Sequence, residues 1–268
     1  MGETIKVAVT GALGRMGREV VQALTPGEGF EIVAAIDRNG EGKRLRDEVG
    51  PNVPDLVVES KLGAALDRTQ PHVLVDFTIH SAALAHGLSA LKRGISPVIG
   101  TTGLKSDEIN ELRLESKEQK VPGIYAPNFA LGAVLMVRFA EMAAKWMPDV
   151  EVIELHHEQK LDAPSGTALL TAERIDAARS KPALERPDQL IKVPGARGAL
   201  AHHVHVHSVR LPGLLAHQEV IFGGKGETLR IQHDSYSRTS FMEGVKLCCR
   251  EVRSLEGFVV GMDRILFG

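Results

Sequence analysis

The stretch IKVAVTGALGRMG, residues 5–17, decides the fold of the first half of this chain. Its apolar, β-branched run at 5–11 is typical of a short buried strand, and that run ends in glycine. A helical pattern follows at 14–24, where apolar residues recur on one face. A strand that turns through glycines into a helix indicates the start of a βαβ unit in a parallel sheet.

The alternation of strands and helices continues as far as residue 128. Further strands are predicted at 31–37, 72–78, 96–103 and 123–128, and helices at 81–93 and 106–120. The charged segment at 38–54, which contains glycines and prolines, predicts a loop. Together these elements predict a Rossmann-like, doubly wound parallel sheet, in which ligands bind at the carboxyl ends of the strands. Those ends carry residues 11–17, Asp37, Thr78, 100–102 and 126–129.

The glycine pattern GALGRMG differs from the general dinucleotide fingerprint GxGxxG, because Leu13 stands where the second glycine is expected. The elements around this pattern are more specific evidence for a dinucleotide site than the pattern itself. The pattern follows a strand and opens a helix, and the acidic Asp37 ends the next strand 26 positions after Gly11. The free amides and the positive dipole at such a helix start can hold a pyrophosphate. The alternative is a glycine-rich turn without a ligand, and the context favours the dinucleotide site.

The residues after the second strand give opposite indications about the cofactor. Asp37 can accept both hydroxyls of the adenine ribose, which favours NADH, whereas Arg38 can pair with the 2′-phosphate of NADPH. Lys43, Arg44 and Arg46 follow, and they either add positive potential or belong to a solvated loop. We therefore expect the protein to use NADH, NADPH or both.

Composition and charge exclude several classes of partner. The 268 residues include 32 Lys and Arg against 34 Asp and Glu, and the formal net charge of −2 provides no overall field for nucleic acid or an anionic membrane. The only cysteines, Cys248 and Cys249, are neighbours in a predicted helix, which is poor geometry for a disulfide. No run of eighteen apolar residues occurs. These features predict a cytoplasmic protein with no nucleic-acid or membrane partner.

The second half has a different pattern. A long apolar-periodic helix is predicted at 129–146 with Asn128 as its cap, followed by a strand from Val150 that ends at the two adjacent histidines. A further helix is predicted at 167–178, with Ser165 or Thr167 as the capping hydroxyl. Strong alternation at 202–211, 217–224 and 227–235 predicts a mostly antiparallel sheet, and residues 239–253 return to helix. The second half therefore indicates an α+β domain with a mixed sheet.

The stretch ELHHEQKLDAPSGTAL at 154–169 gathers groups that suit three kinds of site. A metal site would use His156 and His157, but adjacent residues on a strand point to opposite sides. His203, His205 and His207 would be further donors if their strand is regular, yet neither HExxH nor CxxC occurs. The sequence therefore predicts no metal.

A phosphate cradle and an acid/base site are the other two uses of this stretch. The loop lacks the GxxxxGK[ST] arrangement, so a second nucleotide site is not expected. The amides near Gly166, the hydroxyl of Thr167 and the ammonium of Lys160 suit a carboxylate, and a histidine suits proton transfer. Core packing or a polar surface turn remains the alternative for the two histidines.

At this point the chain resembles the 4-hydroxy-tetrahydrodipicolinate reductase family, also named dihydrodipicolinate reductases, of the diaminopimelate route to lysine. The segments that carry the resemblance are VAVTGALGRMGREV, VDFT, VIGTTGL, APNFALGAVLM, ELHHEQKLDAPSGTAL and HSVRLPGLLAHQEVIFGGKGETLRIQHDSYSR. HHxxK followed by DAPSGTA is the most specific of them. The histidine-rich HHVHVHSVR goes beyond the family pattern, and residues 181–194 show no motif.

The resemblance implies roles for individual residues. His156 and Lys160 would be the catalytic proton-transfer groups, and His157, Gly166 and Thr167 would bind the substrate carboxylates. The nicotinamide would deliver hydride to C4 of (2S,4S)-4-hydroxy-2,3,4,5-tetrahydrodipicolinate, and protonation at C3 would give 2,3,4,5-tetrahydrodipicolinate. The residues expected to bind the cofactor are Gly11, Ala12, Leu13, Gly14, Arg15, Met16, Asp37, Arg38, Gly100, Thr101, Thr102, Ala126, Pro127, Asn128 and Phe129.

The resemblance also implies a domain plan and an assembly. Residues 1–127 would form the dinucleotide-binding domain, with 238–268 packing back on it, and 128–237 would bind substrate and build a homotetramer. Two other functions stay open. The chain could be another NAD(P)-dependent amino-acid dehydrogenase of the aspartate or diaminopimelate type, or a non-catalytic NAD(P)-sensing regulator. A regulator should lack His156 or Lys160, and this chain keeps both.

Overall fold

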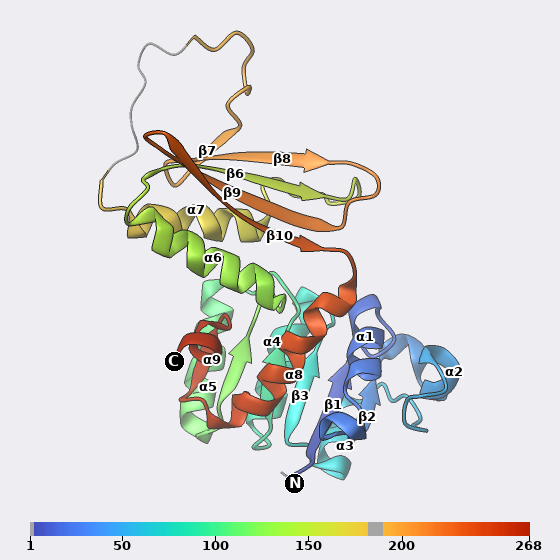
Figure 1. Ribbon diagram of the computed structural model, residues 1–268. Coiled ribbons are helices and arrows are strands. Elements are labelled where there is room, and N and C mark those ends of the chain that lie inside the picture. Colours follow the sequence, from blue (N-terminus) through green and yellow to red (C-terminus); the bar gives the residue numbers. More distant parts are fainter. Residues whose placement is uncertain (1–2, 182–189) are drawn as a thin grey trace. The chain divides into compact units, whose positions relative to one another are not determined.

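The computed structural model describes residues 3–181 and 190–268, and the chain divides into two compact units (Figure 1). The first unit comprises Met1–Phe129 with Phe241–Gly268, and the second comprises Ala130–Ser240. Part of the motif-free stretch at 181–194 lies outside the described residues. Among the described residues, no helix is both long and apolar enough to cross a membrane.

The first unit is built on a parallel sheet with the strand order β2-β1-β3-β4-β5-β11. Its strands are β1 (Ile5–Thr10), β2 (Phe30–Ile36), β3 (Val73–Asp76), β4 (Ser96–Ile99), β5 (Gly123–Tyr125) and β11 (Phe258–Val260). Consecutive buried residues such as Val7, Ala8 and Val9 show that the central strands are covered on both faces. This arrangement confirms the predicted doubly wound sheet, and its order reverses between β1 and β3, where such folds bind ligands.

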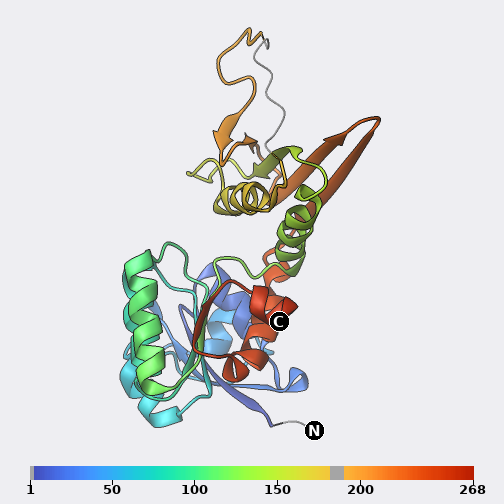
Figure 2. The ribbon, with the colours of Figure 1, turned by 90° about the vertical axis from the view of Figure 1, so that its left-hand side faces the viewer.

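Helices lie on both faces of this sheet. They are α1 (Arg15–Ala23), α3 (Leu62–Thr69), α4 (His80–Leu91), α5 (Ser106–Gln119) and α8 (Met242–Glu251). α1 packs against α8, whereas α3 and α5 each pack against α4, and Figure 2 shows α5 and α8 on opposite sides of the sheet. Shorter elements complete the unit: α2 (Leu45–Val49), α9 (Asp263–Phe267), and 3-10 turns at Pro26–Glu28, Arg38–Gly40 and Val252–Ser254.

The segment after β2 differs from the predicted loop. It contains α2, and α3 follows before β3, so the chain has two helices that periodicity did not predict. The basic residues of this segment make local contacts: Lys43 pairs with Glu48 at 2.8 Å, and Arg44 pairs with Asp55 at 2.9 Å. These contacts support the solvated-loop interpretation of the two basic side chains.

The second unit is built on a mixed sheet with the strand order β10-β9-β6-β8-β7. The strands are β6 (Asp149–His156), β7 (Ala199–Ala201), β8 (Val204–Arg210), β9 (Ala216–Gly224) and β10 (Glu227–Ser235). Only the β6–β8 pair is parallel among these described strands, and the other pairs are antiparallel. α6 (Leu131–Ala144) and α7 (Gly166–Ala178) cover one face, and the core between them and the sheet includes Met136, Val152, Ala172 and Phe222. A 3-10 turn at Arg238–Phe241 follows β10.

Two local predictions for the second unit were wrong. The cap of α6 is Ala130 rather than Asn128, and the helix begins two residues later than expected and ends at Ala144. His202 and His203 have φ values of 46° and 57°, which place them in a left-handed turn between β7 and β8 rather than in a strand. Positive φ at both central residues is the geometry of the type I′ two-residue hairpin turn, whose twist matches that of the flanking strands. His203, His205 and His207 therefore do not line one regular strand.

Candidate active site

The turn between β1 and α1 can be formed only by glycine at two of its positions. Gly11 has φ of 71°, and a Cβ there would collide with the carbonyl oxygen of Phe77. A Cβ at Gly17 would collide with the carbonyl oxygen of Gly11. Gly14 is the N-cap of α1 and offers no capping side chain. The first amides of α1 are therefore left for a partner from outside the helix.

Asp37 and Arg38 follow β2 beside this turn. Oδ2 of Asp37 accepts a hydrogen bond from the amide of Leu13 at 3.1 Å, and Oδ1 accepts from the amide of Asn39 at 2.9 Å. Arg38 is exposed. The acidic residue predicted from the sequence thus lies directly against the glycine turn.

A buried carboxylate that sequence reasoning missed organises the ends of β3 and β4. Asp76 is fully buried, and it accepts hydrogen bonds from the hydroxyls of Thr10 at 2.7 Å and Thr101 at 2.5 Å. Nδ1 of His86 lies 2.6 Å from Oδ2 of the same carboxylate. Burial alone would raise the pKa of Asp76, but hydrogen bonds from His86 and Thr101 outweigh it and lower the pKa below its usual value. The predicted cofactor residue Thr101 is therefore held by an ionised group.

The remaining predicted cofactor segments meet at the same edge of the sheet. The amide of Gly100 donates to the Asp76 carbonyl at 2.8 Å, and the amide of Ala126 donates to the Ile99 carbonyl at 2.9 Å. The rings of Phe77 and Phe129 lie 5.6 Å apart, centre to centre. The structure thus brings 100–102 and 126–129 together beside the switch in strand order.

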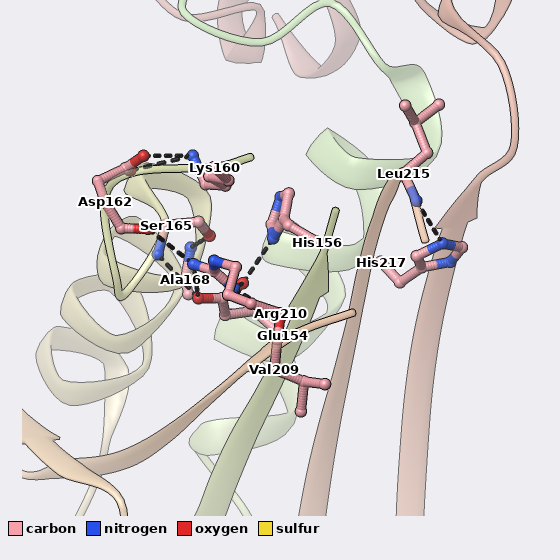
Figure 3. A network of polar contacts seen from close by, with 10 residues as sticks. All are labelled: Glu154, His156, Lys160, Asp162, Ser165, Ala168, Val209, Arg210, Leu215 and His217. Atoms are coloured by element: carbon pink, nitrogen blue, oxygen red, sulfur yellow. Dashed lines mark hydrogen bonds and ion pairs between the residues drawn. The ribbon is translucent and has the colours of Figure 1, made fainter. Parts of the chain in front are cut away.

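The stretch at 154–169 forms a polar cluster at the carboxyl end of β6 (Figure 3). Nδ1 of His156 lies 2.5 Å from Oε2 of Glu154. Arg210, from the end of β8, donates to both oxygens of Glu154 at 2.8 Å. Glu154 is fully buried; burial would raise its pKa, but the hydrogen bonds from His156 and Arg210 lower it to about 2. The cluster therefore holds a histidine ring against a carboxylate that is ionised at neutral pH.

Lys160 and the start of α7 lie next to this cluster. The ammonium of Lys160 contacts Oδ1 of Asp162 at 2.7 Å, and the amide of Lys160 donates to the carbonyl of His157 at 3.1 Å. Ser165, rather than Thr167, caps α7, because its hydroxyl accepts from the amide of Ala168 at 3.2 Å. A Cβ at Gly166 would meet no atom within 4 Å, so the helix start is open at this glycine.

Sequence reasoning missed Glu154 and Arg210, and only one of them left a signal. Glu154 continues the alternate row Val150, Val152 into the core, so a charged residue at a position predicted to be buried marks it. Arg210 comes from a strand 56 residues away along the chain, and nothing near it in the sequence points to Glu154.

Two of the extra histidines, His203 and His207, each pair with a different carboxylate instead of gathering around one point. Nε2 of His207 lies 2.8 Å from Oε2 of Glu151, and Nδ1 of His203 lies 3.1 Å from Oδ2 of Asp176. In the part of the chain that the structure describes, no group of three or more His, Cys, Asp or Glu side chains is arranged to hold a metal ion.

Comparisons with known proteins agree over nearly the whole chain. The family profile described as "Dihydrodipicolinate reductase, N-terminus" matches residues 5–129, and that described as "Dihydrodipicolinate reductase, C-terminus" matches residues 132–266. The chain is 48% identical to the 4-hydroxy-tetrahydrodipicolinate reductase of Bacillus licheniformis and 47% identical to that of Bacillus subtilis, each over 98% of both chains.

Solved structures give the same result. A structure described as "Dipicolinate bound Dihydrodipicolinate reductase from Paenisporosarcina sp. TG-14" is 40% identical, with a TM-score of 0.87 over 98% of this chain and 100% of that one. An amine dehydrogenase from Mycobacterium smegmatis, 15% identical over 97% of this chain and 95% of that one, has a TM-score of 0.69 and shares the fold alone. Both halves of the sequence and the whole fold point to one family: this chain belongs to the dihydrodipicolinate reductases.

Proposed function

We propose that the cluster at the end of β6 binds (2S,4S)-4-hydroxy-2,3,4,5-tetrahydrodipicolinate and assists its reduction by NADH or NADPH. Family membership gives the reaction class, because the chain is a reductase of the diaminopimelate route to lysine. The observation that carries the assignment of the site is the pairing of His156 with the buried Glu154, beside Lys160 and an open helix start.

The two substrate carboxylates suit the cationic and amide groups of this site. Lys160 supplies an ammonium, and the first amides of α7 at Gly166 and Thr167 supply donors together with the positive end of the helix dipole. His157 follows β6 directly and would bind the second carboxylate. The solved relative from Paenisporosarcina is described as binding dipicolinate, a planar dicarboxylate of similar shape, which supports a dicarboxylate in this site.

The proton chemistry falls to His156 and Lys160. Overall, one hydride and one proton are consumed, and the 4-hydroxyl group leaves as water. After hydride reaches C4, the enamine carbon C3 needs a proton, and the imidazole of His156 and the ammonium of Lys160 are the groups of this cluster that can transfer one. The ionised Glu154 stabilises a positively charged His156 ring while that ring holds the proton.

The first unit fits a dinucleotide. The glycine turn leaves no room for a Cβ at Gly11 or Gly17, and α1 begins without a capping side chain, so its amides would hold the pyrophosphate. The residues that would hold the rest of the cofactor are Ala12, Leu13, Arg15, Met16, Asp37, Arg38, Gly100, Thr101, Thr102, Ala126, Pro127, Asn128 and Phe129. The bound nicotinamide supplies the hydride. Asp37 would bind the ribose hydroxyls of NADH, and Arg38 would bind the 2′-phosphate of NADPH, so we infer that both are used.

The second unit would also build the homotetramer. α6 and α7 cover one face of its sheet (Figure 1), and the opposite face carries half-buried side chains such as Ile153, Leu155 and Ile221. The same face also carries Glu151 with its partner His207, so it is mixed in polarity. Such a face can form an oligomer interface, because burying its apolar side chains in a second copy removes them from water. Sedimentation of the purified protein measures the assembly.

The experiment that tests the proposed function is reduction of substrate made in place from pyruvate and aspartate semialdehyde by the preceding synthase. Oxidation of NADH or NADPH, followed by absorbance, reports turnover.

A further inference from the structure

Glu154 is a buried charge on a strand that otherwise supplies apolar residues to the core. It shares its face of β6 with Val150 and Val152, and its side chain is fully buried. A buried carboxylate without partners would strongly destabilise the folded state. The groups that surround Glu154 must therefore stabilise its negative charge.

Those groups come from three separate segments. Oε2 accepts from Nη1 of Arg210 at 2.8 Å and lies 2.5 Å from Nδ1 of His156. Oε1 accepts from Nη2 of Arg210 at 2.8 Å and from the amide of Ser165 at 3.2 Å. One carboxylate thus joins the end of β6, the end of β8 and the cap of α7.

Arg210 extends the same connection to the loop that carries Lys160. Its Nη2 donates to the carbonyl of Asp162 at 2.7 Å while it also donates to Glu154. The β-sheet register places Arg210 directly beside His156 on the neighbouring parallel strand. Glu154 therefore fixes Arg210, and Arg210 in turn fixes the loop between Lys160 and Ser165.

The contact with His156 determines which nitrogen of its neutral ring carries hydrogen. An ionised carboxylate can only accept, so Nδ1 of His156 must be the donor. The neutral ring then has a bare Nε2, and this nitrogen is the one that can take up and return a proton. With the hydrogen on Nε2 instead, the ring could not accept a proton there.

We propose that Glu154 is the positioning residue of the site, which holds His156 in the tautomer with hydrogen on Nδ1 and fastens Arg210 and the start of α7 around it. This role rests on the proposed function of His156 as a proton-transfer group. Glu154 itself is enclosed by protein and does not touch substrate. Its effect on catalysis passes through the ring that it holds.

The variant Glu154→Gln gives a sharp test because hydrogen bonding sets the orientation of the new amide. With its oxygen at the Oε2 position, its NH2 would face two donors, Nη2 of Arg210 and the amide of Ser165. With its oxygen at the Oε1 position, its NH2 faces Nη1 of Arg210 and can donate to Nδ1 of His156. The hydroxyl of Ser208, which also hydrogen-bonds Glu154, can donate to the amide oxygen or accept from the NH2, so it opposes neither orientation. The second orientation opposes fewer donors, so the tautomer of His156 should invert.

Nitrogen NMR of protein labelled with 15N-histidine measures this directly, with the His156 signals assigned by their loss in His156→Gln. We expect hydrogen on Nδ1 in the wild type and on Nε2 in Glu154→Gln. Turnover in the coupled assay should fall on the order of a hundredfold, while the Kd for dipicolinate, measured by calorimetry, stays within about threefold. If Glu154 only stabilised the fold, its replacement would not invert the tautomer of His156. It also would not lower kcat while leaving the Kd for dipicolinate unchanged.

Glu151→Gln is the matched control, because Glu151 lies on the same strand and contacts the same kinds of group. Its carboxylate pairs with His207 at 2.8 Å and also with Arg197. This variant should leave the His156 signals unchanged and kcat within about twofold of the wild type. If Glu154→Gln does not fold, Glu154→Asp keeps a charge for Arg210 but is one methylene shorter, and it should give a mixture of tautomers.

Two results would overturn the proposal. One is hydrogen that stays entirely on Nδ1 in Glu154→Gln, or in Glu154→Asp if the Gln variant does not fold. The other is a kcat within about threefold of the wild type in a variant whose tautomer has changed. A wild type without turnover would contradict the proposed function alone. The NMR measurement needs no turnover, and it would still decide whether Glu154 sets the tautomer.

Discussion

The ammonium of Lys160 lies 2.7 Å and 3.0 Å from the two carboxylate oxygens of Asp162. Hydrogen bonding to Lys160 lowers the pKa of Asp162, so the carboxylate is ionised at neutral pH. The proposed substrate is a dianion that needs the same ammonium. Asp162 therefore competes with the substrate for Lys160.

Replacing Asp162 with Asn should strengthen the binding of a dicarboxylate. Asp162 is 61% exposed in its side chain, and an exposed ion pair contributes about 0–1 kcal/mol, so the Kd for dipicolinate should fall by up to about fivefold. Calorimetry measures the change. Glu158→Gln, which removes an exposed carboxylate from the same loop, is the control and should change the Kd little. Binding that is tenfold weaker in Asp162→Asn would mean that the pair orients Lys160 for the substrate.

Gly166→Ala should weaken the binding of a dicarboxylate without lowering the stability of the protein. A Cβ at this position meets no protein atom within 4 Å, and replacing glycine with alanine at a compatible backbone conformation stabilises a protein by about 0.4–1 kcal/mol, because the unfolded chain loses freedom. The melting temperature should stay the same or rise, whereas the added methyl group should weaken dipicolinate binding at least about tenfold. The matched control is Gly223→Ala, where a Cβ would have only a distant neighbour at 4.0 Å. Unchanged binding in Gly166→Ala would place the substrate elsewhere.

Arg38→Ala should change the preference between the two cofactors. The guanidinium of Arg38 is exposed beside Asp37, and a charge-assisted hydrogen bond contributes about 1.5–3 kcal/mol, so the Kd for NADPH should rise roughly tenfold or more. The Kd for NADH should not rise. Arg44→Ala removes a basic residue that is already paired with Asp55 and serves as the control. Fluorescence titration with each cofactor checks this, and an unchanged affinity for NADPH would show that Arg38 does not contact the phosphate.

The ionised Glu154 should make the stability of the protein depend on pH in acid. Its pKa falls from 4.5 to about 2 on folding, so its stabilising effect is complete above pH 4.5 and is lost as the pH falls through about 2. The full effect corresponds to about 3 kcal/mol. The free energies of unfolding of the wild type and Glu154→Gln, measured in urea, should therefore differ by about 2 kcal/mol less at pH 3 than at pH 7. A constant difference would mean that Glu154 does not stay ionised in the folded protein.

The sequence predicted the elements in which burial gives the apolar residues a simple repeating pattern. β1 to β4 are buried on both faces, and β6 alternates between core and open face, so apolar runs and alternation revealed them. α3 and β11 were missed for a different reason. α3 spans only eight residues and buries Ala65 and Leu66, and β11 is three residues long and pairs with a strand more than 130 positions earlier. Such short elements form because of tertiary contacts that no local window contains.

The candidate site also has a part that the sequence predicted and a part that it could not predict. His156, Lys160 and the cap of α7 lie in one stretch of sequence, and their types and spacing predicted a site for a small anion. Arg210 enters the site only because β8 runs parallel to β6 in a register that pairs it with His156. The sheet likewise brings Asp76, Thr10 and Thr101 together from three different strand ends. Side chains that are joined by sheet register cannot be found without the strand order.

The most direct measurement of the central claim is the coupled assay with the wild type, His156→Ala and Lys160→Ala. Substrate made in place from pyruvate and aspartate semialdehyde should drive oxidation of NADH or NADPH by the wild type, and each variant should lose on the order of a hundredfold in kcat while it still binds the cofactor. No oxidation of either cofactor by the wild type would contradict the reductase assignment. Loss of cofactor binding in a variant would show that the proposed substrate site is misplaced.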